Sequence, residues 1–403
     1  MTGTGANIEP RNLPLEEQRL ILRAALERGL AGREAALAWL PQADIDSMQF
    51  ESLKVLPQLY DRLRTEGIED PLLPRLKGLK KRVWLSNQLL FRAASEAICH
   101  LQQAGIDVMV IKGLAMVVGY YGDYSQRSMG DADLLVRCED ARKACEVLSR
   151  RGWTSEYADA EDPRRSEWAF QHGHAAHLLN SQGKDLDLHW NLLVWRVGPE
   201  VDEDFWAASN EASFGGRKVR ILNPADQLLH ICVHGTDLAP ICWISDAVVV
   251  LRSTPNLDWD RLLTQAQKRN LALMVGNALL HVRHEFANLV PSQVMTELLR
   301  LRVPIFERCE YRALTIPRGR AFGLRMLFRF LCLSRGMNLL DWMRLIPGFL
   351  CVEFKVPSKS QLPAAFFRKT AEEIVGCFVR RSRRAARDVQ GSASIPCAPN
   401  SNG

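Results

Sequence analysis

Apolar residues recur at every third or fourth position through the first hundred residues, and this spacing predicts helices. The pattern is clearest over residues 15–26 and 47–63, and the longest predicted helix covers 76–103. Pro71 and Pro74 separate that helix from the earlier ones. We therefore expect an all-helical lobe at the start of the chain.

Beyond residue 105 the helical spacing gives way to short β-branched and alternating runs, which are typical of strands. The predicted strands cover residues 106–111, 131–136, 153–157, 174–179 and 184–189. Helices are expected over 113–121 and 138–150. Strands alternating with helices and followed by a cluster of strands predict an α/β core, a mixed sheet with helices packed on it.

A second helical region is predicted to begin at Asn223-Pro224, where the proline takes the first helical position. Its helices are expected over residues 225–238, 241–252, 258–268, 271–285 and 292–301. Residues 354–363 read as a loop, and residues 364–387 as a final amphipathic helix with a basic end. The low-complexity stretch 391–403 is expected to be disordered.

Composition excludes several classes of protein. The chain has 403 residues, of which 47% are hydrophobic and 24% charged, and its mean hydropathy is −0.13. These values are average for a globular protein and exclude a disordered chain, a collagen-like fibre and a disulfide scaffold. The ten cysteines form no CxxC pair and read as small hydrophobic residues. Because the chain has neither a spanning apolar segment nor a signal-peptide pattern at its start, we expect a cytoplasmic protein.

The net charge of +6 is unevenly distributed. Residues 380–387 contain five arginines, and without residues 380–403 the net charge would be +2. An interaction with nucleic acid, another polyanion or a membrane surface would therefore depend on this arginine cluster alone.

The candidate chemistry lies in the predicted strands. Asp131 and Asp133 are two residues apart, so a strand would present both carboxylates on one face. Two such carboxylates repel each other unless a cation lies between them, and Mg²⁺ prefers oxygen ligands. Asp187, on another alternating strand, can supply a third carboxylate, and Asp185 is its competitor for that role. A turn followed by a chance D-x-D pair is the plain alternative.

Phosphate-binding groups precede these aspartates. Lys112 and Gly113 stand where a strand meets a helix, which offers a cation, close backbone approach and free N–H groups. Arg127 can act as a second cationic clamp, and Lys112 is expected to be exposed. Three carboxylates with two Mg²⁺ about 4 Å apart suit phosphoryl or nucleotidyl transfer.

These residues resemble an uncharacterised nucleotidyltransferase family of the DNA polymerase β-like superfamily. The resemblance covers about residues 89–350 and is carried by Lys112-Gly113, Arg127, Gly130–Val136, Leu186–Trp190, Asn223–His234 and Trp243–Asp246. It departs from the wider superfamily at the phosphate loop, where Leu114 replaces the serine of the usual Gly-Ser.

The resemblance implies an α+β fold, in which a polymerase β-like core with a small mixed sheet is flanked by helical domains. The expected divisions are a helical N-terminal lobe, a nucleotidyltransferase core, a helical acceptor-side domain, a loop with a basic amphipathic helix, and a disordered tail. They cover residues 1–85, 86–222, 223–350, 351–390 and 391–403, respectively.

The implied activity is transfer of a nucleoside monophosphate from a nucleoside triphosphate to an unknown hydroxyl or phosphate acceptor, which can be a small molecule, a sugar or a protein. Two Mg²⁺ or Mn²⁺ ions would be bound by Asp131, Asp133 and Asp187, and the last of these would hold the ion that activates the acceptor. Lys112, Gly113, Arg127 and Gly130 would bind the triphosphate. Candidate substrate-side groups are His189, His230, His234 and Asp246.

Other interpretations stay open. His230 and His234 face the same side of a helix, but no glutamate follows His230, so the zinc-protease motif is absent and a hydrogen-bonded, half-buried pair is favoured. The cluster His172, His174, His177 and His189 has no partners spaced for zinc and reads as structural or surface-exposed. P-loop, Rossmann and nucleophile-elbow motifs do not occur. The rival functions are a catalytically inactive binding module and a peripheral membrane or polyanion binder that uses the basic C-terminal helix.

Overall fold

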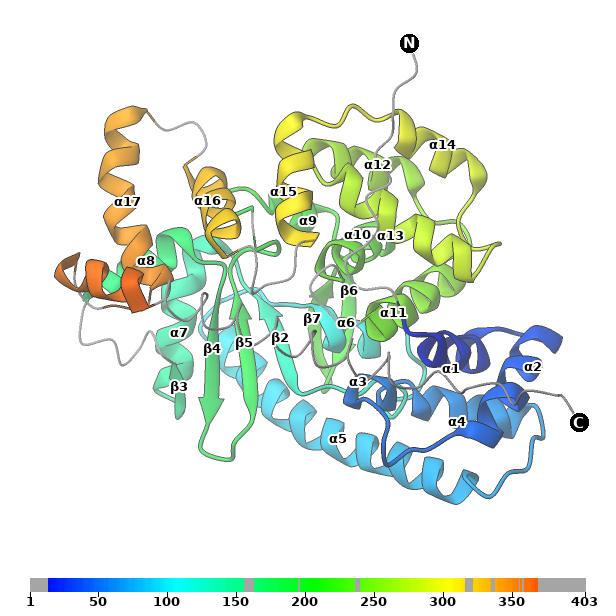
Figure 1. Ribbon diagram of the computed structural model, residues 1–403. Coiled ribbons are helices and arrows are strands. Elements are labelled where there is room, and N and C mark those ends of the chain that lie inside the picture. The colour runs from blue at the N-terminus through cyan, green and yellow to red at the C-terminus, as the bar shows by residue number, and fades with distance from the viewer. Residues whose placement is uncertain are drawn as a thin grey trace, which may run out of the picture. The chain divides into compact units, whose positions relative to one another are not determined.

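The computed structural model describes residues 14–155, 163–194, 196–235, 240–315, 322–334, 338–354, 356 and 359–368. The chain forms two compact units, Met1–Thr315 and Ile316–Gly403. Each is described by itself below (Figure 1).

The first unit begins with the predicted helical lobe. Its helices are α1 (Glu16–Leu26), α2 (Leu30–Trp39), α3 (Phe50–Leu53), α4 (Leu56–Thr65) and α5 (Leu73–Gln103), with a 3-10 turn at Leu40–Gln42. Apolar residues at helical spacing, among them Ile21, Leu59 and Leu63, are fully buried. The sequence placed the start of α5 too late, because Pro74 lies in its first turn, where a proline interrupts no hydrogen bond.

A seven-stranded mixed sheet forms the centre of the first unit. Its strands follow the order β3-β4-β5-β2-β1-β7-β6. Their bounds are β1 (Met109–Val110), β2 (Asp131–Leu135), β3 (Trp153–Ser155), β4 (Ala175–Asn180), β5 (Asp185–His189), β6 (Asn210–Phe214) and β7 (Arg217–Ile221). The pairs β2–β5 and β1–β7 are parallel, and the other neighbours are antiparallel. The mixed sheet agrees with the α/β core that the sequence predicts.

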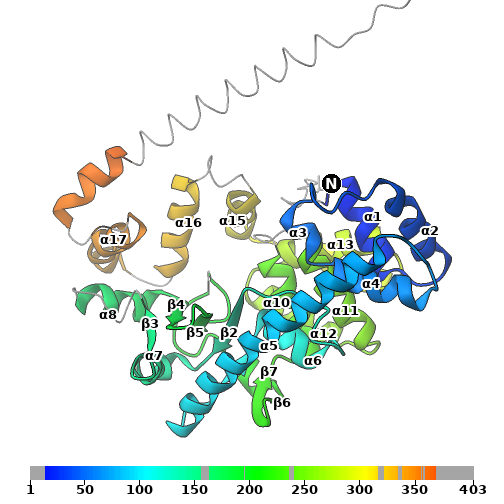
Figure 2. The same cartoon turned by 90° about the horizontal axis from the view of Figure 1, so that it is seen from below.

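The two faces of the sheet differ in character. Alternate residues of the central strands, such as Leu134, Leu186 and Leu188, are fully buried in one cluster with apolar residues of α5 and α7 (Ala141–Ser149). Figure 2 shows α5 as a long helix that runs from the sheet to the N-terminal helices. Because side chains alternate along a strand, the aspartates of β2 and β5 lie on the opposite face.

Several elements of the first unit were not predicted from the sequence. The sequence analysis missed the hairpin β6–β7 and the helices α8 (Pro163–His172) and α9 (Glu203–Ala207). The hairpin turns at Gly215-Gly216, both with positive φ (56° and 74°), as a two-residue turn of this kind requires. His172 ends α8, so it does not share a strand with the other histidines of its cluster. The 3-10 turn Cys138–Asp140 precedes α7, in place of one continuous helix.

The second helical region of this unit matches the predicted series. It comprises α10 (Pro224–His234), α11 (Pro240–Ser253), α12 (Trp259–Lys268), α13 (Ala272–Glu285) and α14 (Ser292–Arg300). The predicted helix α6 (Lys112–Gly119) lies beside the sheet, outside this series, and α15 (Ile305–Thr315), which follows the series, was not predicted. The predicted helix 225–238 is described as far as His234 and the following Gly235; residues 236–239 lie outside the described residues.

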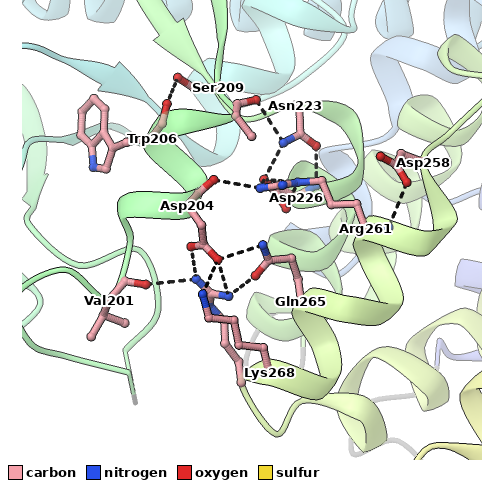
Figure 3. A network of polar contacts seen from close by, with 12 residues as sticks. Val201, Asp204, Trp206, Ser209, Asn223, Asp226, Asp258, Arg261, Gln265 and Lys268 are labelled. Atoms are coloured by element: carbon pink, nitrogen blue, oxygen red, sulfur yellow. Dashed lines mark hydrogen bonds and ion pairs between the residues drawn. The ribbon is translucent and has the colours of Figure 1, made fainter.

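A polar network fixes α10 in place (Figure 3). The guanidinium of Arg261, on α12, donates to both carboxylate oxygens of Asp226 on α10, with Nε–O distances of 3.0 Å. Asp226 is fully buried. Asp204, on α9, accepts hydrogen bonds from Gln265 and Lys268, also on α12, at 3.0 and 2.8 Å. The network therefore holds the first turn of a helix that lines the candidate site.

The second unit contains α16 (Phe322–Leu333), α17 (Leu339–Glu353) and a 3-10 turn at Lys359–Gln361. Phe330 packs edge-on against Trp342, with ring centroids 5.3 Å apart. Residues 362–368 are helical, so the predicted loop 354–363 ends slightly earlier than expected. The rest of the predicted basic helix, the arginine cluster 380–387 and the tail 391–403 lie outside the described residues. No helix in the described part of the chain is both long and apolar enough to cross a bilayer.

The division of the chain into the five segments expected from the sequence remains a prediction. The structure adds that α5 is a single helix of 31 residues that passes from the N-terminal lobe into the sheet region. Its first half contacts α4, and it also packs on α7 and β2.

Candidate functional site

The site is built on two parallel strands in register. Asp131 pairs with Asp185 across β2 and β5, and Asp133 pairs with Asp187. All four side chains therefore project from the face of the sheet opposite α5 and α7. This arrangement concentrates four carboxylates on adjacent strands.

Asp133 lies at the centre of this cluster and is only 3% exposed. Its Oδ1 is 2.5 Å from Nζ of Lys112 and 3.1 Å from Nε2 of His189. Burial by itself would raise the pKa of Asp133, but the hydrogen bond with His189 and the charge of Lys112 hold it well below its usual range. The Asp133 carboxylate is therefore ionised and firmly positioned.

His189 acts on Asp133 through one nitrogen only. Nδ1 of His189 is buried and has no hydrogen-bond partner. An unpaired acceptor nitrogen costs less here than a buried, unpaired N–H, so we assign the proton to Nε2, which then donates to Asp133. This tautomer makes His189 a positioning residue for Asp133.

Asp131 experiences the repulsion that the sequence pattern implies. Burial raises the pKa of Asp131, and the nearby charges of Asp133 and Asp187 raise it further. A bound divalent cation would relieve this repulsion, because it stabilises the ionised carboxylates together.

The donor atoms fit a divalent metal ion. Among the described residues, one ligand atom each from Asp133, Asp187 and His189 lie within 4.8 Å of one another. Asp131 lies outside this tight group, although it is close enough for the charges of Asp133 and Asp187 to raise its pKa. Carboxylate oxygens suit Mg²⁺ and Mn²⁺. In the tautomer assigned above, Nε2 of His189 carries a proton, so His189 orients Asp133 and the carboxylates are the candidate ligands.

His177 is a member of the cluster that sequence reasoning placed among structural or surface histidines. It lies on β4 opposite Asp187. Its Nδ1 is 3.1 Å from Asp187, and its Nε2 is 3.4 Å from Asp185. The hydrogen bond with Asp187 raises the pKa of His177. The alternation of β4 next to β5 was the available signal, because it places His177 on the acidic face.

The turn between β1 and α6 brings Lys112 over Asp133. Lys112 has a left-handed backbone conformation, with a φ of 50°, which is strained for a non-glycine residue. Its side chain is only 19% exposed, so the expectation of an exposed lysine is wrong. At Gly113 a Cβ would lie 2.9 Å from the side chain of Met129, whereas Gly130 has open space around it.

Arg127 is held by Asp246, which lies on α11. Its Nε is 2.9 Å from Oδ1 of Asp246, and its Nη2 is 3.0 Å from Oδ2. The hydroxyl of Tyr121 also donates to Asp246, at 2.9 Å. Arg127 and Asp246 thus form a partly buried pair that ties the loop before β2 to α11.

His230 and His234 lie one turn apart on α10, as the sequence predicts. Their rings stack with centroids 5.7 Å apart and an interplanar angle of 15°. Burial lowers the pKa of His230 well below its usual value, and the neighbouring His234 and Lys112 lower it further. His230 is therefore neutral.

A cavity of about 550 Å³ lies against the acidic strands, within the first unit. It brings together residues from the predicted phosphate turn, the acidic strands, α10 and α11. They include Lys112, Gly113, Arg127, Gly130, Asp131, Asp185, His177, Gln227, His230, His234, Trp243 and Asp246. A volume of this size is typical of sites for small-molecule ligands.

Comparison with known proteins adds the family. No curated protein matches the chain. Among solved structures, the chain is similar to an antigenic nucleotidyltransferase-like protein from Paracoccidioides brasiliensis, with 15% identity over 52% of this chain and 92% of that one and a TM-score of 0.32. The family model described as "uncharacterised nucleotidyltransferase" matches residues 49–287, which include the acidic strands, Lys112 and the α10 histidines. Because the family model matches more than half of the residues of this chain, the chain belongs to the uncharacterised nucleotidyltransferase family.

Proposed function

We propose that the protein transfers a nucleoside monophosphate from a nucleoside triphosphate to a hydroxyl or phosphate acceptor and releases pyrophosphate, with a divalent metal bound by Asp131, Asp133 and Asp187. The observation that carries this proposal is the register of β2 and β5, which gathers these carboxylates on one face beside the cavity. Family membership supports a transferase of this type.

A metal ion held by these aspartates would stabilise the charge that develops on the transferred phosphoryl group. Asp133 and Asp187 are the best-placed ligands because they belong to the tight donor group, and Asp131 would have to move toward them to complete the set. His189 keeps Asp133 oriented, since its Nε2–H donates to Oδ1. His177, beside Asp187, would have to release that carboxylate.

Lys112 and the turn that follows are the proposed triphosphate site. The Lys112 ammonium can exchange its contact with Asp133 for a phosphate oxygen, because both are anionic and Lys112 lines the cavity. Gly113 leaves the backbone accessible, and Arg127 presents its guanidinium on the cavity wall in an orientation that Asp246 fixes. The departure at Leu114 removes a hydroxyl, so Lys112 carries more of the phosphate binding.

The acceptor is proposed to enter from the side of α10 and α11. Gln227 and His230 line this wall and are 0% and 2% exposed. Oε1 of Gln227 has no hydrogen-bond partner. A neutral His230 and an unpaired amide oxygen are suited to receive hydroxyl protons from an acceptor.

The test is transfer of label from each of the four nucleoside triphosphates, labelled in the α-phosphate, in the presence of Mg²⁺ or Mn²⁺ and a cell extract as the source of acceptor. We expect the wild-type protein to label an acceptor and Asp131→Asn to lose this activity. Asp107→Asn is the matched control, because Asp107 pairs with Arg220 away from the cavity. Absence of transfer with every nucleotide, together with absence of nucleotide binding, would contradict the proposal.

A further inference from the structure

Helix α17 has two apolar faces, and only one of them is packed. Trp342 and Phe349 face α16, where both contact Phe330 with ring centroids 5.3 and 5.2 Å away. The other face carries Leu339, Leu340, Met343 and Ile346 at a spacing that places them on one side of a helix. An apolar second face is unusual for a helix at a protein surface.

The outer face of α17 is strongly exposed. Leu339, Leu340 and Met343 are 75%, 66% and 64% exposed, and Ile346 is 38% exposed. Further large apolar residues of the same unit are also exposed, namely Leu324, Leu327, Phe366 and Phe367. Apolar residues gathered in this way mark a surface that binds a partner.

The charge of the second unit identifies the kind of partner. Residues 316–403 contain 15 lysines and arginines and 5 acidic residues, a formal net charge of +10. The remaining 315 residues therefore have a net charge of −4. Next to the apolar face, the side chain of Arg344 is 81% exposed. The whole positive excess of the protein thus lies in the unit that contains α17.

We propose that the second unit binds the surface of an anionic lipid bilayer, with α17 lying in the plane of the interface. Its outer face would insert among the acyl chains, and basic residues of the same unit would contact lipid phosphates. A helix of 15 residues that contains Pro347 is too short to span a bilayer, which fits this in-plane orientation. A nucleic acid would use the positive charge but would leave the exposed leucines and Met343 in water.

The proposal is independent of the proposed catalytic activity and is tested on the full chain by sedimentation with vesicles. One vesicle preparation contains phosphatidylcholine alone, and the other contains about one third phosphatidylserine. We expect binding to the anionic vesicles, weakened by high salt, and little binding to the neutral ones. The triple substitution Leu339→Ser, Leu340→Ser and Met343→Ser should weaken binding about tenfold or more.

The matched control replaces three apolar residues of similar exposure in the first unit. Leu30→Ser, Leu299→Ser and Ile305→Ser change side chains that are 78%, 74% and 80% exposed. This variant should bind vesicles as the wild type does. Both variants should keep the wild-type thermal unfolding midpoint, since exposed side chains contribute little to folding. The proposal would be overturned if the wild type did not bind anionic vesicles, or if the α17 variant bound them as tightly as the control variant does.

Discussion

Lys112 and Asp133 form an ion pair, with Nζ and Oδ1 2.5 Å apart, at the centre of the acidic cluster. The lysine ammonium therefore occupies a position next to the carboxylate that a metal ion would also use. Because Asp133 is buried, this positive charge helps to stabilise its ionised carboxylate, a role that a bound metal ion would also fill. A bound triphosphate would give Lys112 a second anionic partner.

Replacing Lys112 should therefore separate metal binding from nucleotide binding. In Lys112→Gln, the affinity for Mn²⁺ without nucleotide should rise about threefold to tenfold, because a competing cation is removed. The affinity for triphosphate should fall in the same variant. Titration of free Mn²⁺ by electron paramagnetic resonance measures the first effect.

Lys54→Gln is the control for this experiment. Lys54 lines the same cavity but pairs with Glu51, with Nζ and Oε2 2.7 Å apart. Its loss should change Mn²⁺ affinity by about twofold at most. Equal effects of the two substitutions would mean that Lys112 acts only through the overall charge of the cavity.

The two aspartates of β5 should differ in their effect on metal binding. Asp187→Asn should weaken Mn²⁺ binding about tenfold or more, because Asp187 belongs to the tight donor group, whereas Asp185→Asn should be tolerated. Calorimetric titration of both variants distinguishes the two. If Asp185→Asn were the more damaging change, the third ligand would have been assigned to the wrong residue.

The buried pair between Arg261 and Asp226 should be important for stability. Arg261→Ala leaves the fully buried Asp226 carboxylate without its main partner, which should cost about 3–5 kcal/mol in the free energy of unfolding. Arg64→Ala breaks an exposed pair with Glu69 and should cost less than about 0.5 kcal/mol. Urea denaturation of both variants measures the difference.

Asp202 should make the protein less stable as the pH rises. Burial raises the pKa of Asp202 to about 7, and its Oδ1 has no hydrogen-bond partner. Because the folded-state pKa exceeds the unfolded value of about 3.9, the contribution of Asp202 to stability is present below pH 4 and is lost as the pH rises toward 7.

Asp202→Asn should remove this dependence. The variant should be about 1–3 kcal/mol more stable than the wild type at pH 8, and the difference should shrink toward pH 4. The asparagine can still accept the hydrogen bond from the backbone N–H of Leu192, which is 2.6 Å from the Asp202 carboxylate. Urea denaturation across this pH range is the measurement, and a constant difference would show that Asp202 does not titrate in it.

Substitutions at the two glycines of the β6–β7 turn should separate the cost of backbone strain from the cost of a steric clash. Gly215→Ala should destabilise the protein by about 2 kcal/mol or more, since its φ is positive and a Cβ would lie 2.4 Å from Oγ of Ser95. Gly216→Ala has a positive φ but open space around it, so a loss of about 1 kcal/mol is expected. Thermal unfolding of both variants should rank them in this order; the reverse order would exclude the clash with Ser95.

The sequence predicted the elements whose signal is local. The strand with Asp131 and Asp133 follows from periodicity and turn residues. So does the series of five helices from residue 224 onward, the first of which contains His230 and His234. The β6–β7 hairpin was also within reach, because Gly215-Gly216 between two alternating runs is a strong hairpin signal.

Contacts between distant segments were not predictable in this way. The pairing of Arg127 with Asp246 joins residues 119 positions apart, and the contact of His177 with Asp187 depends on which strands are neighbours. A single sequence gives the periodicity of each strand but not the order of strands in the sheet. For the same reason, the sequence predicted which aspartates form the acidic cluster but not that Lys112 is buried against Asp133.

The in-register pairing of β2 with β5 also determines how the site can fail. A slip of one residue between the strands would send Asp185 and Asp187 into the apolar layer beneath α5 and bring Leu186 and Leu188 into the cavity. Burying two unpaired carboxylates and exposing two leucines would cost more than a typical domain's entire stability margin. Molecules with misaligned carboxylates are therefore excluded from the folded population. A destabilising substitution in these strands should reduce the number of folded molecules, while each molecule that still folds keeps an intact acidic cluster.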